Sequence, residues 1–238
     1  MGNIYLSIDM GVPQIGCTDC SKCSSLMGKS LCVTKNRGCC HYFPEFSLLE
    51  LQRMAILEGG KKALDTILSK PGTVVNNYSI YAKGSFDSDS YNAYISSGHY
   101  LETGNIKDHT IFYRTCPMVE PGKGCTLPPR FRTTVCNFFI CQEIIGRHEH
   151  LFKDLLEERS RYARWVYREN GILQHILSEE GLDFKTDFNA SIELLAQMEH
   201  SYYDFPSFSP IEYGPSGSSE PDPFDFWEPF GTHNKTSA

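Results

Sequence analysis

The heptapeptide CTDCSKC at residues 17–23 decides how this sequence is interpreted, because it holds three cysteines at intervals of two residues. Two adjacent cysteines follow at 39 and 40. A second segment, CPMVEPGKGCTLPPRFRTTVCNFFIC at residues 116–141, holds four more. Two intervening residues allow the chain to turn and direct both thiolates at one metal. The pattern therefore predicts a metal site to which two distant segments contribute ligands.

The first run favours an iron–sulfur cluster, with [4Fe–4S] as the leading form. Cys17-x2-Cys20-x2-Cys23 matches the first three ligands of the bacterial ferredoxin run, in which the fourth cysteine is followed by proline, as Cys116 is here. Zinc is the alternative, although a closed zinc site needs only four ligands, usually delivered as two pairs. The predicted metal ligands are Cys17, Cys20, Cys23, Cys39, Cys40, Cys116, Cys125, Cys136 and Cys141.

The adjacent pair, Cys39 and Cys40, bears on the number of centres. Neighbouring side chains of extended backbone point to opposite sides, so the two thiols are expected to face separate centres unless one is a bystander. The ten cysteines suffice for two four-cysteine sites with two left over. We therefore expect two centres or one multinuclear site. Cys32, in SLCVTK, is expected to be a small buried hydrophobic residue.

Other polar residues near the cysteines are weaker candidates. His41 directly follows the cysteine pair and is either a ligand or a packing residue. Arg130 and Arg132 place positive charge near thiolates, where they could offset cluster charge or bind an anionic substrate. His148 and His150 are two residues apart, which on a helix places them on different faces and argues against a joint metal site.

Composition narrows the class of protein. The chain has 238 residues, a formal net charge of −7 and scattered basic residues, which gives no reason to expect nucleic acid or an anionic membrane as partner. Its first residues have neither a basic nor an apolar region typical of a signal peptide, so a cytoplasmic location is expected. There thiols stay reduced, and clustered cysteines more often bind metal than form disulfides.

Hydrophobic periodicity predicts an α+β fold that is predominantly helical. Residues 1–45 are expected to be irregular and shaped by the metal. Strands are predicted at 73–83 and 109–116, separated by a loop with at most one helical turn. Helices are predicted at 46–58, 61–70, 151–170, 172–180 and 187–205, with Asn170-Gly171 ending the third and Asp187 or Asn189 capping the last. These helices are expected to form a small bundle packed against the cysteine-rich half.

This pattern divides the chain into three parts. Residues 1–145 form a metal-stapled cysteine-cluster domain, and residues 146–205 form a helical part packed on the same core. Residues 206–238 are rich in Pro, Ser and Gly and poor in aliphatic side chains, so they are predicted to be disordered. Within them, PFDFWEPF at 223–230 is aromatic and acidic, and it is either a docking motif for a protein partner or part of a flexible tail.

The two cysteine segments together resemble those of the YkgJ-like family, often described as zinc- or iron-chelating. That family pairs an early CxxCxxCC block with a later block ending in C-x2-f-p-C, and here residues 17–54 and 115–141 are similar to the two blocks. An insertion containing Cys32 separates Cys23 from Cys39, and Thr133 stands where the family has proline after an arginine. A related group, the flagellin lysine N-methylases, is associated with an iron–sulfur cluster and methyl transfer.

Three functions fit these observations. The first is a redox or group-transfer enzyme containing an iron–sulfur cluster, with methyl transfer as the analogy that the resemblance implies. The second is a non-catalytic interaction module in which zinc stabilises the fold. The third is a metal storage or delivery protein, since the thiols outnumber those of one site.

Overall fold

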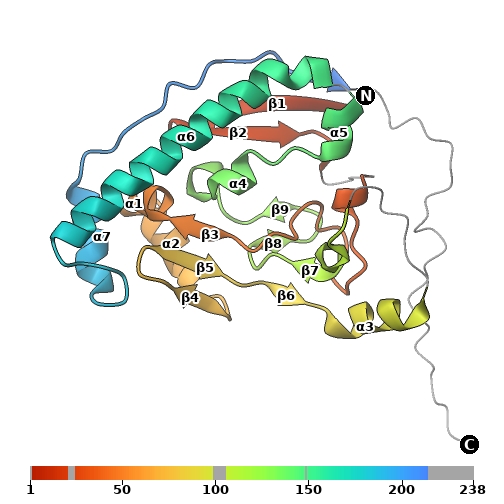
Figure 1. Cartoon of the computed structure of the whole chain (residues 1–238), viewed down its shortest axis with the longest axis horizontal. Coiled ribbons are helices and arrows are strands. Elements are labelled where there is room, and N and C mark those ends of the chain that lie inside the picture. The colour runs from red at the N-terminus through yellow and green to blue at the C-terminus, as the bar shows by residue number, and fades with distance from the viewer. Residues whose placement is uncertain (1, 21–24, 99–105, 148, 214–238) are drawn as a thin grey trace, which may run out of the picture.

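Helices and small antiparallel sheets alternate along the chain in an α+β arrangement (Figure 1). The computed structural model describes residues 2–20, 25–98, 106–147 and 149–213. The helices are α1 Leu48–Ile56, α2 Gly60–Leu68, α3 Ser88–Ser97, α4 Thr134–Asn137, α5 Gln142–Arg147, α6 Glu149–Glu179 and α7 Phe188–Gln197. The strands are β1 Gly2–Asp9, β2 Val12–Cys17, β3 Glu45–Ser47, β4 Thr73–Val75, β5 Ser79–Ala82, β6 Ser85–Phe86, β7 Arg114–Thr115, β8 Val119–Glu120, β9 Gly124–Cys125 and β10 Ile211–Tyr213.

The expectation that residues 1–45 are irregular is wrong at their beginning, because β1 and β2 form an antiparallel hairpin. Met10 and Gly11 connect the strands with φ of 50° and 78°, both in the left-handed region that a type I′ turn requires. The ring of Tyr5 lies over Gly16, where a Cβ would approach the ring to 2.3 Å. Met10-Gly11 lacks the usual Asn-Gly or Asp-Gly signature, so the sequence pattern did not reveal the turn.

The predicted helices at 46–58 and 61–70 are confirmed as α1 and α2. Ser47 and Glu50 form the capping box expected at the start of α1. Gly59, at φ 82°, separates the two helices. Asp187 caps α7 by accepting a hydrogen bond from the Ala190 amide at 2.9 Å, as predicted.

The prediction that Asn170-Gly171 ends a helix is wrong, since α6 continues through this pair to Glu179. Asn170 is satisfied inside the helix because its Nδ2 donates to the Val166 carbonyl at 2.9 Å. Its Oδ1 accepts from the amide of Leu49, in the first turn of α1, also at 2.9 Å. A residue expected to stop its own helix therefore caps a different one.

The segment between residues 73 and 116 also differs from the prediction. Residues 73–83 contain two strands, β4 and β5, which pair with each other and with β3. Residues 109–113 form a 3₁₀ turn instead of a strand. The expected loop contains the ten-residue helix α3, which is capped by Asp87 and ended by Gly98 in the left-handed conformation. The local capping signals, Asp87 and Gly98, therefore outweigh the polar composition.

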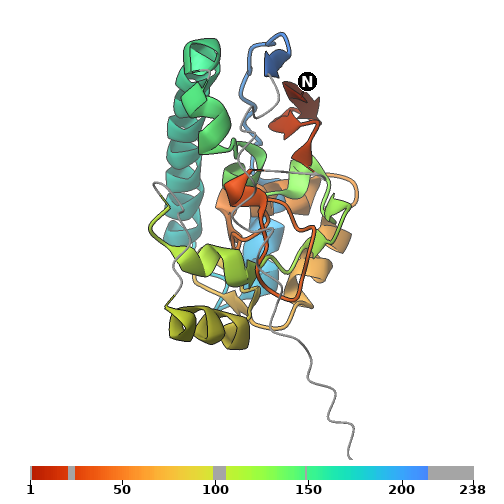
Figure 2. The same ribbon diagram turned by 90° about the vertical axis from the view of Figure 1, so that its right-hand side faces the viewer.

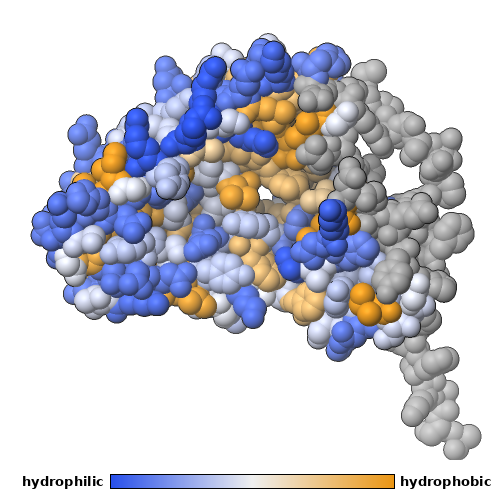
Figure 3. All heavy atoms as spheres, in the orientation of Figure 1, coloured by the Kyte–Doolittle hydropathy of each residue, from blue (hydrophilic) through white to orange (hydrophobic). Residues whose placement is uncertain are grey.

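The main hydrophobic core surrounds α1, which contacts α2, α6 and α7. Helix α6 forms one side of the molecule, and α3 lies at the opposite end from the N-terminus in both views (Figures 1 and 2). Hydrophilic side chains project along α6, and apolar side chains gather in the region of the β1–β2 hairpin (Figure 3). Aromatic rings join the helical part to the rest of the core: Phe138, Tyr162, Trp165, Tyr203 and Phe205.

The predicted disorder from residue 206 is wrong for residues 206–213. Strand β10 pairs antiparallel with β1, with Tyr213 opposite Gly2. Phe208 and Ile211 pack against the main core, which explains why this stretch is ordered despite its prolines. Residues 214–238, with the PFDFWEPF segment, lie outside the described residues. Within the described part of the chain, no helix has the length and apolarity to cross a membrane.

The cap that α6 supplies to α1 predicts a measurable loss of stability in Asn170→Ala. Removing the side-chain acceptor of the Leu49 amide should lower the free energy of unfolding by about 1 kcal/mol. Urea denaturation measures this change, and Asn189→Ala, at an exposed position of α7, is the matched control. Equal losses in the two variants would contradict the assignment of Asn170 as a cap.

Candidate metal centre

Cys39 and Cys40 lie in a turn, where the extended-backbone expectation for them does not apply. Gly38 has φ 57°, the Cys40 amide donates to Arg37 O at 3.3 Å, and the His41 amide donates to Cys39 O at 2.8 Å. Hydrogen bonding to Cys20 and to Cys40 raises the pKa of Cys39. Hydrogen bonding to Cys39, together with the charges of Arg132 and Arg37, lowers the pKa of Cys40 to about 7.

Four thiols from the two cysteine segments lie close enough to interact electrostatically in every pairwise combination. They are those of Cys40, Cys116, Cys125 and Cys136, and we call them the four-thiol cluster. The Cys116 amide donates to Cys40 O at 2.9 Å, which joins the two segments through the backbone. Burial raises the pKa of Cys116 to about 12 and that of Cys136 to about 11. The metal-free thiols are therefore protonated at neutral pH, except that Cys40 ionises near pH 7.

Each member of the four-thiol cluster is held by a different short element. Cys116 follows β7, and Cys125 ends β9, where it pairs with Val119 of β8. Cys136 lies in α4, and its amide donates to Thr133 Oγ1, the cap of that helix, at 3.3 Å. These elements are too short to bury much surface themselves, so their positions depend on contacts with the helical core.

The carboxylate of Glu50 makes one such contact between α1 and α4. Glu50 is 2% exposed, and its Oε1 accepts from the amide and the hydroxyl of Thr134, both at 2.9 Å. Its Oε2 accepts from the Ser47 amide at 2.8 Å. One buried carboxylate therefore caps α1 and fixes the first turn of the helix that carries Cys136.

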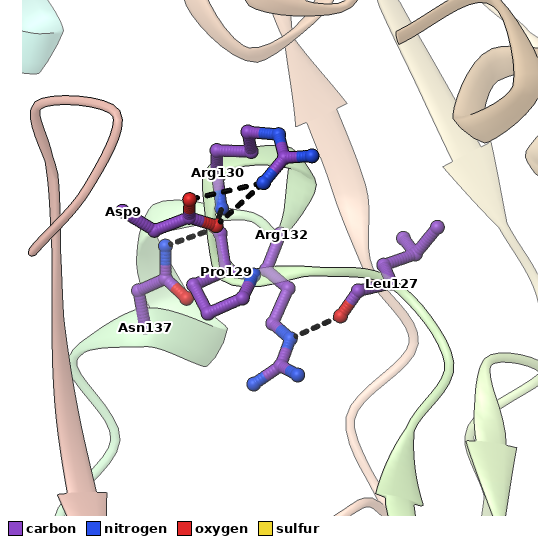
Figure 4. Close-up of polar contacts among 6 residues, drawn as sticks. All are labelled: Asp9, Leu127, Pro129, Arg130, Arg132 and Asn137. Atoms are coloured by element: carbon purple, nitrogen blue, oxygen red, sulfur yellow. Dashed lines mark hydrogen bonds and ion pairs between the residues drawn. The ribbon is translucent and has the colours of Figure 1, made fainter. Parts of the chain in front are cut away.

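Of the two arginines predicted near the thiolates, Arg132 faces the four-thiol cluster and Arg130 does not. Arg132 Nε donates to Leu127 O at 2.7 Å (Figure 4), and its guanidinium also hydrogen-bonds to the Cys125 thiol. Arg130 instead forms an ion pair with Asp9 at 3.0 Å, which ties the β1–β2 hairpin to the second cysteine segment (Figure 4). Asn137 Nδ2 donates to Pro129 O at 2.9 Å and steadies the turn between them.

Arg37 is a site residue that the sequence did not reveal. It is 2% exposed, and its guanidinium donates to the carbonyls of Lys29, Gly38 and Ile111 at 2.6–2.9 Å. Its positive charge acts on the nearby thiols of Cys32, Cys39 and Cys40. No Asp or Glu of the described chain pairs with it, and its Nε has no hydrogen-bond acceptor there. A single arginine in KNRG carries no sequence signal for such burial.

The remaining predicted ligands have other neighbours. Cys17 ends β2 opposite Ile4, and Cys20 is exposed and hydrogen-bonded to Cys39. Cys141 Sγ lies 3.5 Å from Ser25 Oγ, so the end of the second segment lies beside residue 25. Cys23 lies outside the described residues, and the predicted second centre stays a prediction.

Cys32 and the histidines complete the comparison with the sequence. Cys32 is 2% exposed and contacts Ser30 and Thr115, as expected of a buried packing residue. His41 packs edge-on against Phe139 at 6.2 Å, and burial with the nearby Arg37 charge lowers its pKa to about 4. It is therefore neutral at pH 7. His150 is exposed, and His148 lies outside the described residues.

The donor chemistry of the four-thiol cluster fits a Cys₄ site, which zinc and iron–sulfur clusters share. The geometry of a bound ion is not already formed: within the described ranges, no three Cys, His, Asp or Glu side chains converge on one point. A cysteine sulfur moves between three staggered positions by rotation about χ1 alone. Ligation by these four residues would therefore require their side chains to rotate.

Comparisons with known proteins add no family assignment. The chain matches no family model, no curated protein and no solved structure. The resemblance to the YkgJ-like family therefore stays a prediction from the cysteine spacing.

The link between α1 and α4 predicts that Glu50→Gln destabilises the protein. Replacing one carboxylate oxygen by an amide group leaves a donor facing the donors of Ser47 or Thr134, at a cost of roughly 1–3 kcal/mol in the free energy of unfolding. Urea denaturation measures it, with Glu58→Gln, at an exposed position beyond α1, as the control. A loss no larger than that of the control would show that the carboxylate does not hold α4.

Proposed function

We propose that this chain is a metal-binding protein whose four-thiol cluster binds an iron–sulfur cluster. Cys40, Cys116, Cys125 and Cys136 would be the ligands. The observation that carries the proposal is the burial of Arg37 beside Cys40, one of these four thiols, with no carboxylate among the described residues to balance its charge.

Electrostatics explains why a buried arginine calls for an anion. A charge removed from water is stable only when it is paired or extensively hydrogen-bonded, and three carbonyl dipoles satisfy only part of this guanidinium. The metal-free thiols provide at most the partial charge of Cys40 near pH 7. Four thiolates around Zn²⁺ or a [4Fe–4S]²⁺ core carry a net charge of about −2. Arg37 and Arg132 both act on Cys40, and their two charges would neutralise such a group.

Hydrogen bonds to the ligand sulfurs favour a redox or group-transfer role over simple storage. The Cys39 thiol hydrogen-bonds to Cys40, and the Arg132 guanidinium hydrogen-bonds to Cys125. Such bonds, together with burial, tune the reduction potential of an iron–sulfur cluster, which supplies electron-transfer chemistry when bound. The chain itself would orient the ligands, keep water from the sulfurs and supply the balancing positive charge.

A structural zinc ion is the second candidate, favoured by the elements that carry the ligands. Strands β7, β8 and β9 contain two residues each, and α4 contains four. Elements this short gain little from their own packing, and a metal that joins them stabilises the fold directly. In this case the protein would be a non-catalytic module.

Metal content separates the two candidates and tests the ligands. Protein purified without oxygen should be brown and contain iron and sulfide if it binds an iron–sulfur cluster, and colourless with zinc otherwise. Cys136→Ser should lose most of this metal, because it removes one of four ligands.

Cys32→Ser is the matched control, because Cys32 is a buried cysteine outside the four-thiol cluster, and it should keep the metal. Both variants are analysed for iron, zinc and sulfide on parallel preparations. Full metal content in Cys136→Ser would reject the ligand assignment.

The charge argument predicts that Arg37→Met weakens the stabilisation that metal binding provides. The difference in unfolding free energy between metal-bound and metal-free protein should be smaller in the variant by about 1–3 kcal/mol, the contribution of hydrogen bonds to a charged group. Denaturation of both forms measures it. The three carbonyl hydrogen bonds are missing from both forms of the variant, so the subtraction cancels their effect. An unchanged difference would mean that Arg37 does not balance a charge at this site.

A further inference from the structure

Cys20 and Cys39 form a thiol pair at the surface, next to the four-thiol cluster but outside it. Their side chains hydrogen-bond to each other. Cys20 is exposed, whereas the other eight cysteines that the structure describes are buried or partly buried. An oxidant arriving from solvent therefore meets Cys20 first, with Cys39 already in contact behind it.

Gly38 allows this approach of the two segments. It has φ 57°, and a Cβ at this position would lie 3.1 Å from the Cys20 carbonyl oxygen and 3.7 Å from Cys20 Sγ. Both the conformation and the contact disfavour any residue with a side chain. The backbone next to Cys39 therefore lies against the carbonyl and the sulfur of Cys20.

We infer that Cys20 and Cys39 are a site of reversible oxidation, at which a peroxide converts the two thiols into a disulfide. The Cys20 thiolate attacks a peroxide oxygen, the O–O bond breaks, and a sulfenic acid and hydroxide form. The Cys39 sulfur then attacks the Cys20 sulfur, the S–S bond forms, and the S–O bond breaks with loss of water. In sum, two thiols and one hydrogen peroxide give one disulfide and two waters, and a dithiol reductant reverses the change.

This inference does not depend on the proposed metal function, because neither thiol belongs to the four-thiol cluster. It assigns a separate role to Cys20 and Cys39, which lie outside the four-thiol cluster. Closing the pair consumes oxidant at the surface before it reaches the sulfurs of Cys116, Cys125 and Cys136, which are buried or half-buried.

Peptide mapping of the peroxide-treated full-length protein tests the inference. Trypsin places Cys20 in residues 1–22, Cys23 in residues 23–29, and Cys39 with Cys40 in residues 38–53. After treatment with hydrogen peroxide and alkylation of free thiols, a linked pair of peptides 1–22 and 38–53 should appear in the mass spectrum and disappear on treatment with dithiothreitol. Fragmentation of the linked pair should place the bond at Cys20 and Cys39.

Variants decide between this bond and its alternatives. Cys20→Ser and Cys39→Ser should each lose the linked pair, while Cys141→Ser, at a half-buried cysteine beside Ser25, should keep it. Gly38→Ala retains both thiols but separates them, and it should slow formation of the bond. A disulfide between Cys39 and Cys40, a disulfide between Cys20 and Cys23, or over-oxidation of Cys20 without any bond would overturn the inference.

Discussion

The uncompensated charge of Arg37 is the constraint from which the cysteine-rich half of the molecule is best understood. A guanidinium this deeply buried needs both hydrogen-bond acceptors and negative charge. The carbonyls of Lys29, Gly38 and Ile111 supply the acceptors and, in doing so, fix three separate loops around one group. The neighbouring thiols are the groups able to supply the charge, and they do so fully only as thiolates. Backbone order and thiol ionisation are therefore coupled through one side chain.

The helical core is the second requirement, because the ligand-bearing elements cannot hold their own positions. Glu50 belongs to the capping box of α1 and also fixes the start of α4, so the helix register is transmitted to Cys136. The Asp9–Arg130 ion pair similarly joins the β1–β2 hairpin to the second cysteine segment. The helices and the hairpin thus position the thiols, although few of the cysteines belong to these elements.

Local signals in the sequence predicted the parts of the fold that local physics controls. The capping box at Ser47, the glycine at 59 and the Asp187 cap are all confirmed, because each depends on residues within one turn. Asn170 was misinterpreted, because its side chain satisfies a helix 121 residues away in sequence. The hairpin at 2–17 and the ordered stretch at 206–213 depend on pairing with distant partners, which no local pattern contains.

In the candidate site, too, some features could be predicted from the sequence and others depend on distant residues. Cysteine spacing predicted that the two segments meet, and the Cys116–Cys40 backbone contact joins them. Spacing could not show which of the nine predicted ligands form one site, because that depends on how deeply each thiol is buried and on the residues around it. Cys39 and Cys40 illustrate this best. They are adjacent in sequence, yet Cys40 belongs to the four-thiol cluster while Cys39 hydrogen-bonds both to Cys40 and to the exposed Cys20. Cys40, a candidate metal ligand, is therefore bonded in sequence to Cys39, the thiol that connects it to the surface. Oxidation of Cys39 would remove a hydrogen bond from the sulfur of Cys40.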